Sequence, residues 1–238
     1  MKNIIEAKHL GISFGDKNVI EDLSFEVRKG EIFGFLGSNG SGKTTTIRAL
    51  LGLYQPSRGS ILINGKIFAA GAEPVGYLPE ERGLYKKETV LDVMVYFGRL
   101  KGMDNPLKWS LDYLNRVGLS DKPKERIDHL SSGQQQKVQL GITIMNNPEL
   151  LILDEPTKGF DPVNRKLLMD IIDERHRAGA TIILITHYMD EVERLCDRAL
   201  LLKDGVAKVY GTIAAIKKQF GGQSLDEIFV KIYGSEDA

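Results

Sequence analysis

The chain has 238 residues, of which 42% are hydrophobic and 27% are charged. This length and composition are typical of a globular protein with one large α/β domain, or one domain with an insertion. Its 32 basic residues equal its 32 acidic ones, so the basic surplus of a nucleic-acid binder is missing and we expect no nucleic-acid partner. A single cysteine, Cys196, excludes an internal disulfide.

The chain also lacks the sequence signals of a membrane-embedded or secreted protein. No apolar stretch approaches the roughly 20 residues that a membrane-spanning helix needs. The segment Met1 to Leu10 has no apolar run of the kind found in signal peptides. We therefore expect a cytoplasmic protein whose membrane role, if it has one, comes through a partner.

The first half of the chain is predicted to consist mainly of strands joined by turns. A turn at Gly15 to Asn18 separates the first two strands, and the dipeptide Asn64-Gly65 predicts a tight turn after the last one. Between the third and fourth strands, a glycine-rich loop opens a helix. The predicted strands are at 4–14, 19–27, 32–36 and 60–63, the loop is at 37–42 and the helix is at 43–53.

In the second half, a helical block precedes alternating strands and helices. Helices are predicted at 89–101, 107–117, 133–145, 162–177 and 189–196, and strands at 150–153, 181–186, 199–202 and 206–210. A last short helix after residue 221 has an apolar stripe, which favours packing on the domain over a dimer contact; the stripe is Leu225, Ile228, Phe229 and Ile232. The order predicts an α/β core with a mostly parallel sheet and a helical insertion near 80–145.

The glycine-rich loop carries the most specific pattern in the chain. Residues 37–44 read G-S-N-G-S-G-K-T, which matches the phosphate-binding pattern G-x-x-x-x-G-K-[ST]. The glycines let backbone N–H groups point inward at the start of a helix. Lys43 would then contact the β- and γ-phosphates, and the Thr44 hydroxyl would ligate Mg²⁺. The alternative is a glycine-rich turn before a lysine, which the preceding apolar strand and the following helix disfavour.

Two acids follow the buried strand at 150–153. A carboxylate at the end of such a strand lies at the sheet edge where α/β proteins bind ligands. Asp154 suits the Mg²⁺ shell and Glu155 suits polarisation of an attacking water. Unless the strand has already ended, the two side chains point to opposite faces. The alternative is that Asp154 caps a helix.

Between these two motifs, Leu130-Ser131-Ser132-Gly133-Gln134 resembles LSGGQ, the signature sequence of the ATP-binding cassette (ABC) ATPases. The resemblance extends from about residue 4 to residue 210. It implies a P-loop NTPase core, at about 1–79 and 146–220, with an N-terminal antiparallel β subdomain. It also implies a helical subdomain at about 80–145, and a short C-terminal helix within 221–238.

The resemblance assigns roles to individual residues. Catalysis falls to Glu155, His187 and Lys43, and the metal ligands are Thr44, Asp154 and Glu80. Phe14 stacks on adenine, and the second protomer completes the site with part of its signature sequence. The residues implied to bind ATP are Phe14, Gly37, Ser38, Asn39, Gly40, Ser41, Gly42, Lys43, Thr44 and Thr45, and Ser131, Gly133 and Gln134 across the dimer.

Glu80 departs from the family, which usually has glutamine at this position. The carboxylate can still ligate Mg²⁺, but it adds negative charge near the triphosphate. The run Gly76 to Tyr85 and the segment Ser224 to Phe229 resemble a bacterial branch that exports sodium, drugs or antibiotics. The implied partners are a transmembrane permease and a second ATPase protomer, either identical or a close paralogue, with the chain peripheral on the inner face of the membrane.

Three alternatives remain at this point. A soluble ABC ATPase of translation or DNA repair usually has two cassettes, a long coiled coil or zinc modules, and this chain has one cassette and none of these. A non-catalytic nucleotide binder disagrees with the presence of Lys43, Asp154, Glu155 and His187. A GTPase is disfavoured because no Asn-Lys-x-Asp motif occurs.

Overall fold

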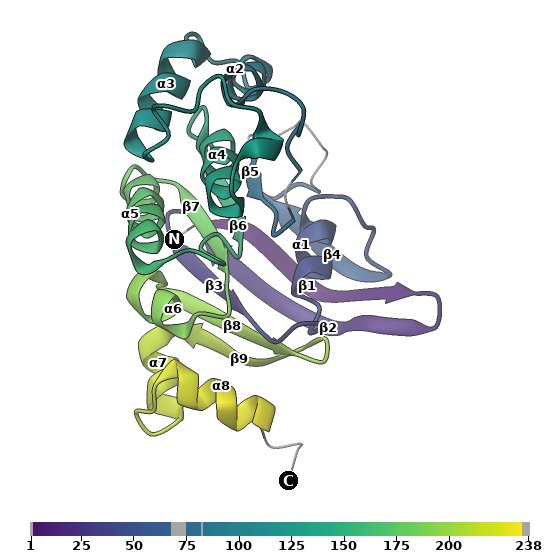
Figure 1. Cartoon of the computed structure of the whole chain (residues 1–238). Coiled ribbons are helices and arrows are strands. Elements are labelled where there is room, and N and C mark those ends of the chain that lie inside the picture. Colours follow the sequence, from purple (N-terminus) through teal and green to yellow (C-terminus); the bar gives the residue numbers. More distant parts are fainter. Residues whose placement is uncertain (1, 68–74, 82, 235–238) are drawn as a thin grey trace. The chain divides into compact units, whose positions relative to one another are not determined.

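The computed structural model describes residues 2–67, 75–81 and 83–234 (Figure 1), and it divides into two compact units. The first unit comprises Met1–Pro74 and Thr181–Ala238, and the second unit comprises Val75–Ala180. The fold is α/β, with a mixed, mostly parallel sheet and an N-terminal antiparallel sheet, as predicted. The predicted subdomain boundaries at 80 and 145 stay a prediction.

The antiparallel sheet of the first unit consists of β1 (Asn3–Phe14), β2 (Lys17–Arg28) and β4 (Arg58–Ile63), in the order β2-β1-β4. The first turn is tighter than predicted, because Lys17 and Asn18 already pair with the end of β1. The predicted turn at Asn64-Gly65 is confirmed, since both residues have positive φ and a bridge joins Ile63 to Lys66.

The remaining strands of the first unit are β7 (Thr181–Ile185), β3 (Ile32–Leu36), β8 (Arg198–Lys203) and β9 (Val206–Thr212), adjacent in that order. β3 is parallel to both of its neighbours, and β9 returns antiparallel to β8. Every residue of β3, β7 and β8 is buried, as expected of strands covered on both faces. These strands form the core of this unit, and the glycine-rich loop follows directly after the carboxyl end of β3.

The first unit contains the helices α1 (Lys43–Leu50), α6 (Met189–Leu195), α7 (Ile213–Gln219) and α8 (Leu225–Tyr233). α1 ends three residues earlier than predicted, since Gly52 in the left-handed conformation stops it. The sequence analysis missed α7, whose first turn is capped by the hydroxyl of Thr212 accepting the N–H of Ala215 at 3.1 Å.

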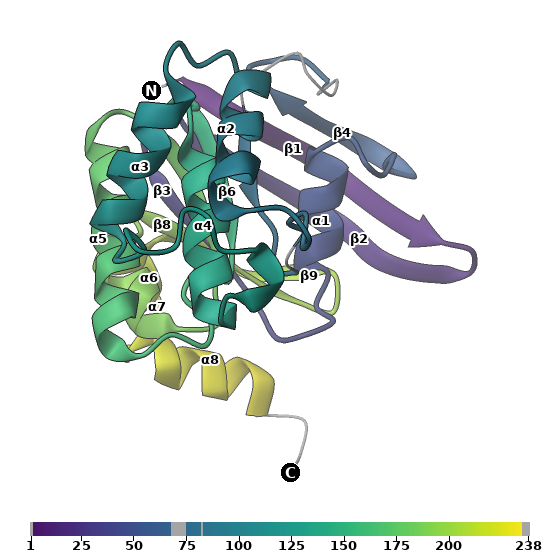
Figure 2. The same cartoon turned by 45° about the horizontal axis from the view of Figure 1, so that its top comes forward.

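In the second unit, the strands β5 (Val75–Leu78) and β6 (Leu150–Asp154) are parallel. Its helices are α2 (Val90–Leu100), α3 (Pro106–Arg116), α4 (Ser132–Ile144), α5 (Pro162–Arg177) and the 3-10 helix η1 (Ile127–His129). Figure 2 shows α2, α3 and α4 side by side. Gly141 on α4 allows this packing, because a Cβ there would come within 2.4 Å of the ring of Tyr113.

A half-buried lysine binds the carbonyl groups at the C-terminal end of α4. Lys101 Nζ donates to the carbonyl oxygens of Ile142 at 2.6 Å and Thr143 at 3.2 Å, which lie in the last turn of that helix. A cation there offsets the negative end of the helix dipole. Burial nevertheless lowers the pKa of Lys101 to about 8. Lys101 therefore joins the end of α2 to the end of α4.

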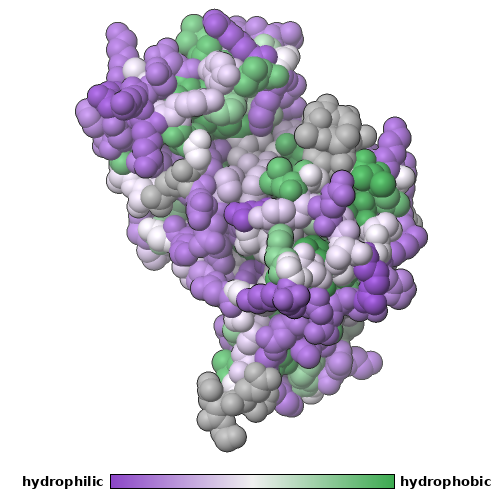
Figure 3. All heavy atoms as spheres, turned by 90° about the vertical axis from the view of Figure 1, so that its right-hand side faces the viewer, coloured by the Kyte–Doolittle hydropathy of each residue, from purple (hydrophilic) through white to green (hydrophobic). Residues whose placement is uncertain are grey.

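Among the described residues, none of the helices combines the length and the apolar character needed to cross a bilayer. On the face drawn in Figure 3, hydrophilic side chains predominate and the hydrophobic ones form separate small patches. Several of the larger exposed apolar side chains belong to the second unit, and they include Tyr85, Tyr96 and Leu100.

Candidate functional site

The glycine-rich loop connects β3 to α1 in the first unit. Gly40 and Gly42 have φ values of 82° and 106°, a backbone conformation that strains any side chain beyond glycine. Lys43 folds back over the loop, because its Nζ donates to the carbonyl oxygens of Gly37 at 2.8 Å and Ser38 at 2.9 Å. The carbonyl oxygens of these two residues are thereby held on the ammonium group.

Close packing fixes two of the glycines. A Cβ on Gly37 would lie 2.5 Å from the carbonyl oxygen of Leu202 and 2.5 Å from Ser41 Oγ. A Cβ on Gly42 would lie 2.5 Å from Ile20 Cδ1. A strand of each sheet therefore packs closely against the loop. The fold of the whole unit thus sets the shape of the loop.

The loop fits a phosphate group chemically. Ser41 Oγ is buried and has no hydrogen-bond partner among the described residues, which is costly for a hydroxyl unless a ligand satisfies it. Thr44 and Thr45, in the first turn of α1, are half-buried. A helix N-terminus, a lysine and an orphaned hydroxyl together form a site for an anion with several acceptor oxygens.

Phe14, the predicted adenine contact, ends β1 with 47% of its surface exposed. Its ring meets the ring of Tyr54 edge-on, with centroids 5.1 Å apart, and the hydroxyl of Tyr54 accepts a hydrogen bond from Arg48 at 3.2 Å. The exposed face of Phe14 suits stacking on a base. The role of Tyr54 was not predicted, although an aromatic residue four positions after α1 was a signal for it.

His187 follows β7 in the same unit and is exposed. Its ring lies against the ring of Tyr188, with centroids 4.2 Å apart. The turn is organised by Thr186, whose hydroxyl donates to buried Glu191 at 3.2 Å and accepts the N–H of Tyr188 at 3.1 Å. Glu191 was missed because nothing local in the sequence separates it from other helical acids.

The two acids belong to the second unit. β6 ends at Asp154, and Glu155 has a φ of 50°, so the strand has ended and the opposite-face rule does not apply to the pair. Both residues are buried. Asp154 is not a helix cap, since the next helix, α5, begins at Pro162 with Asp161 as its cap. A buried acid held in the left-handed region is typical of a functional position.

The signature segment opens α4. Ser131 Oγ accepts the N–H of Gln134 at 3.3 Å, and Gln134 Oε1 accepts the N–H of Ser131 at 2.9 Å, which is a capping box. Gly133 is needed for packing, because a Cβ there would lie 3.1 Å from the ring of Phe160. The exposed Ser131 thus lies at a positive helix end, in agreement with an anion contact.

A protein-family model described as "ABC transporter" matches residues 20–158, more than half of the chain. The chain belongs to the ABC transporter family. It is an ATP-binding subunit and an ATPase of that family.

Several relatives resemble this ABC subunit over most of its length. An uncharacterized ABC transporter ATP-binding protein of Methanocaldococcus jannaschii is 50% identical, over 91% of this chain and 80% of the relative. The Linearmycin resistance ATP-binding protein of Bacillus subtilis is 33% identical, over 95% and 75%. Nod factor export ATP-binding protein I of a Rhizobium species is 38% identical, over 91% and 73%. A solved structure of an ATP binding subunit of an ABC transporter has a TM-score of 0.85 and 35% identity, covering 96% of this chain and 98% of that one.

The unusual Glu80 of this ABC subunit has a partner that the sequence analysis did not find. Lys158 Nζ donates to Glu80 Oε1 at 2.6 Å, and both side chains are about half exposed. Lys158 therefore balances the charge that replaces the family's glutamine. No local pattern predicts the pair, because 78 residues separate its members. Arg82, in the exporter-like run, lies outside the described residues.

The predicted site residues of this ABC subunit are divided between the two units. The loop, Phe14 and His187 belong to the first unit, whereas Glu80, Asp154, Glu155 and the signature segment belong to the second. Each group is ordered by contacts within its own unit.

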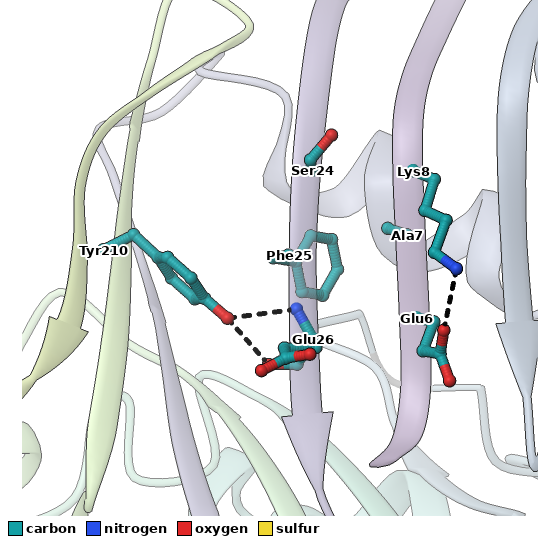
Figure 4. A pocket seen from close by; sticks show the side chains of 7 residues that line it. All are labelled: Glu6, Ala7, Lys8, Ser24, Phe25, Glu26 and Tyr210. Atoms are coloured by element: carbon teal, nitrogen blue, oxygen red, sulfur yellow. Dashed lines mark hydrogen bonds and ion pairs between the residues drawn. The ribbon is translucent and has the colours of Figure 1, made fainter.

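A separate hollow of about 250 Å³ lies on the antiparallel sheet of the first unit (Figure 4). Its polar groups largely satisfy one another: Lys8 pairs with Glu6 at 3.1 Å, and the Tyr210 hydroxyl accepts the N–H of Glu26 at 3.2 Å. Arg198 supports the Tyr210 ring, since its guanidinium group lies 4.8 Å from the centroid of that ring. We therefore interpret this hollow as a structural feature of the sheet and not as a ligand site.

Substitution of the two positive-φ glycines separates backbone strain from packing. We expect Gly42→Ala to lower the free energy of unfolding by more than Gly40→Ala, because only Gly42 faces an atom, Ile20 Cδ1, at 2.5 Å. Gly40→Ala should cost about 1 kcal/mol from strain alone, and Gly42→Ala about 1–3 kcal/mol more from overpacking. Urea denaturation of both variants measures the difference. Equal losses would show that Ile20 moves aside.

Proposed function

We propose that this ABC subunit binds Mg-ATP between two protomers and hydrolyses it to energise export through a separate transmembrane permease. The observation that carries the proposal is the loop from Gly37 to Thr44, in which Lys43 holds the loop carbonyls and Ser41 Oγ is buried without a partner among the described residues. Export is supported by relatives named for linearmycin resistance and Nod factor export.

The loop residues would bind and orient the triphosphate. Amide N–H groups of residues 39, 40 and 42–44 and the Ser41 hydroxyl donate to phosphate oxygens, while Lys43 supplies a positive charge. Phe14, supported by Tyr54, holds the adenine by stacking. Because these groups are fixed before the nucleotide arrives, little reorganisation opposes binding.

Glu155 would orient and polarise the attacking water, and its position directly after the carboxyl end of β6 favours this role. His187, at the end of β7, would hold the γ-phosphate as negative charge moves to the leaving group. Thr44, Asp154 and Glu80 are the groups that would hold Mg²⁺, an ion that prefers oxygen ligands and neutralises phosphate charge when bound.

A second protomer would complete the site with Ser131, Gly133 and Gln134. The N-terminus of α4 is half-exposed and carries a partial positive charge, so a γ-phosphate held by another copy is a suitable ligand. Two such contacts give a two-fold, head-to-tail dimer. Loss of the γ-phosphate removes the contact, and the dimer opens.

The permease would contact the exposed aromatic cluster of the second unit, formed by Tyr85, Tyr96 and Phe97. Tyr85 is 54% exposed and Tyr96 is 48% exposed, and the three rings contact one another with centroids 5.5–6.1 Å apart. Rigid aromatic residues at a surface are typical anchors of protein interfaces. The cluster follows Glu80 in sequence, so a change at the metal ligand would reach it along a short segment.

We expect Glu155→Gln to bind ATP normally, to form a stable dimer with Mg-ATP and to hydrolyse it at least about 100-fold more slowly, because the amide cannot accept the proton. Size-exclusion chromatography with light scattering, together with phosphate release, measures both effects. Lys43→Ala serves as the control that loses nucleotide binding. Normal turnover of Glu155→Gln would remove Glu155 from the role of base.

Glu80→Gln tests the metal assignment. The Glu80–Lys158 pair is exposed, so its loss should change the free energy of unfolding by less than about 1 kcal/mol. The Mg²⁺ concentration for half-maximal ATPase activity should rise, since an amide oxygen binds Mg²⁺ more weakly than a carboxylate. Lys158→Met breaks the same pair but keeps the carboxylate. If both variants raise the Mg²⁺ requirement equally, Glu80 acts only through the ion pair.

Tyr96→Ala tests the permease contact. The variant should keep the ATPase activity of the isolated subunit and co-purify less with a multi-spanning membrane protein encoded by a neighbouring gene. Lys208→Ala, an exposed change on β9, is the control. Equal recovery of the membrane protein with both variants would place the permease contact elsewhere.

A further inference from the structure

The C-terminal helix α8 reaches the phosphate loop through one side chain. The hydroxyl of Tyr233 accepts the N–H of Ser38 at 2.9 Å and donates to the carbonyl oxygen of Leu202 on β8. Ser38 and Tyr233 are 195 residues apart in sequence, and Tyr233 belongs to none of the motifs of the proposed site. We propose that Tyr233 is a positioning residue for the phosphate loop, held in place by α8. This inference rests on the proposed role of that loop in binding ATP.

The contact falls on a critical peptide group. The carbonyl of Gly37 and the N–H of Ser38 belong to the same peptide unit, which is planar. Lys43 Nζ holds the carbonyl oxygen at 2.8 Å, and Tyr233 holds the N–H at 2.9 Å on the opposite side of that unit. With both ends held, the peptide cannot rotate without breaking a hydrogen bond. Tyr233 therefore fixes the entrance of the loop and, through it, the carbonyl that anchors Lys43.

Neighbouring groups hold the Tyr233 ring. Phe229 packs on it with centroids 4.4 Å apart, and Lys203 Nζ lies 5.5 Å from its centroid. Lys203, which is buried, also donates to the carbonyl oxygen of Ile232 at 3.0 Å, in the last turn of α8. The absence of a side chain on Gly37 leaves room, since a Cβ there would lie 3.2 Å from the Tyr233 hydroxyl. Tyr233, at the C-terminal end of α8, thus packs closely against the phosphate loop.

The other end of α8 is tied to α6, and the two helices pack together (Figures 1 and 2). Glu193 on α6 accepts the N–H of Leu225 at 2.7 Å and pairs with Lys217 at 2.9 Å. The hydrogen bond from Leu225, followed by that from Lys217, lowers the pKa of Glu193. α6 begins two residues after His187. One helix therefore links the element that follows the predicted γ-phosphate contact to the entrance of the phosphate loop.

The decisive variant is Tyr233→Phe, which keeps the ring and removes only the hydroxyl. The N–H of Ser38 and the carbonyl of Leu202 then lose this partner, and the Gly37–Ser38 peptide is released. We expect the Kd for ATP to rise about threefold to tenfold, the range for loss of the one hydrogen bond that Tyr233 makes to the loop. The kcat at saturating ATP should stay within about twofold, because Glu155 is untouched. A general loss of folding would instead reduce the active fraction and leave the Kd unchanged.

Isothermal titration with ATP in EDTA measures the Kd without hydrolysis, and steady-state assays give kcat and KM. Val230→Ala, at the 66% exposed position of the same helix, is the matched control. Glu193→Ala and Lys217→Ala form a second pair: both break the ion pair, but only Glu193→Ala removes the acceptor of the Leu225 N–H, so only it should weaken ATP binding.

The outcomes distinguish this inference from the proposed function. If the wild-type chain binds ATP and Tyr233→Phe binds it within twofold of the wild type, or no more weakly than Val230→Ala, the positioning role is wrong and the proposed function stands. If neither the wild type nor any variant binds ATP, the proposed function fails and this inference fails with it.

Discussion

The hydrogen bonds that Lys43 donates to the carbonyls of its own loop are the interaction on which the proposed site depends. A chain segment that binds a triphosphate must present N–H groups and turn its carbonyl oxygens away from the ligand. Here the ammonium group gathers two of those carbonyls, and the left-handed glycines make the required backbone accessible. The same cation that neutralises phosphate charge thus also shapes the pocket that receives the phosphate.

A loop of this kind is rigid only if its surroundings hold it. Gly37 lies close to β8, and Gly42 lies close to Ile20 on β2, so both sheets of the first unit pack against the loop. The buried strands β3, β7 and β8 give it a fixed base, whereas Phe14 is exposed and contacts Tyr54 edge-on. Packing therefore orders the phosphate end of the site, whereas the adenine end depends on a single edge-to-face ring pair. We accordingly expect the site to discriminate weakly among bases and to derive most of its affinity from the phosphates.

The order of elements and the motif positions could be predicted from the sequence, because both rest on local patterns. The loop and its flanking elements β3 and α1, the capping box at Ser131 and Gln134, and the helix α5 behind Asp161 follow from short-range periodicity and cap chemistry. Long-range contacts could not be predicted. The pair Glu80–Lys158 and the support of Phe14 by Tyr54 are set by tertiary packing. The helix α7 was missed because it begins directly after β9, with no loop between the two elements.

α8 has features that could be predicted from the sequence and long-range contacts that could not. Its capping box at Ser224 and Glu227 and its buried face of Leu225 and Ile228 are visible in the sequence, and they explain why a helix forms and packs there. Those features would be satisfied equally well by a helix that ended before Tyr233. The last turn adds a hydroxyl between Leu202 and Ser38, and it adds the carbonyl that Lys203 binds. The last turn therefore has two roles: it anchors α8 through Lys203 and through the ring contact of Phe229 with Tyr233, and it contacts the phosphate loop.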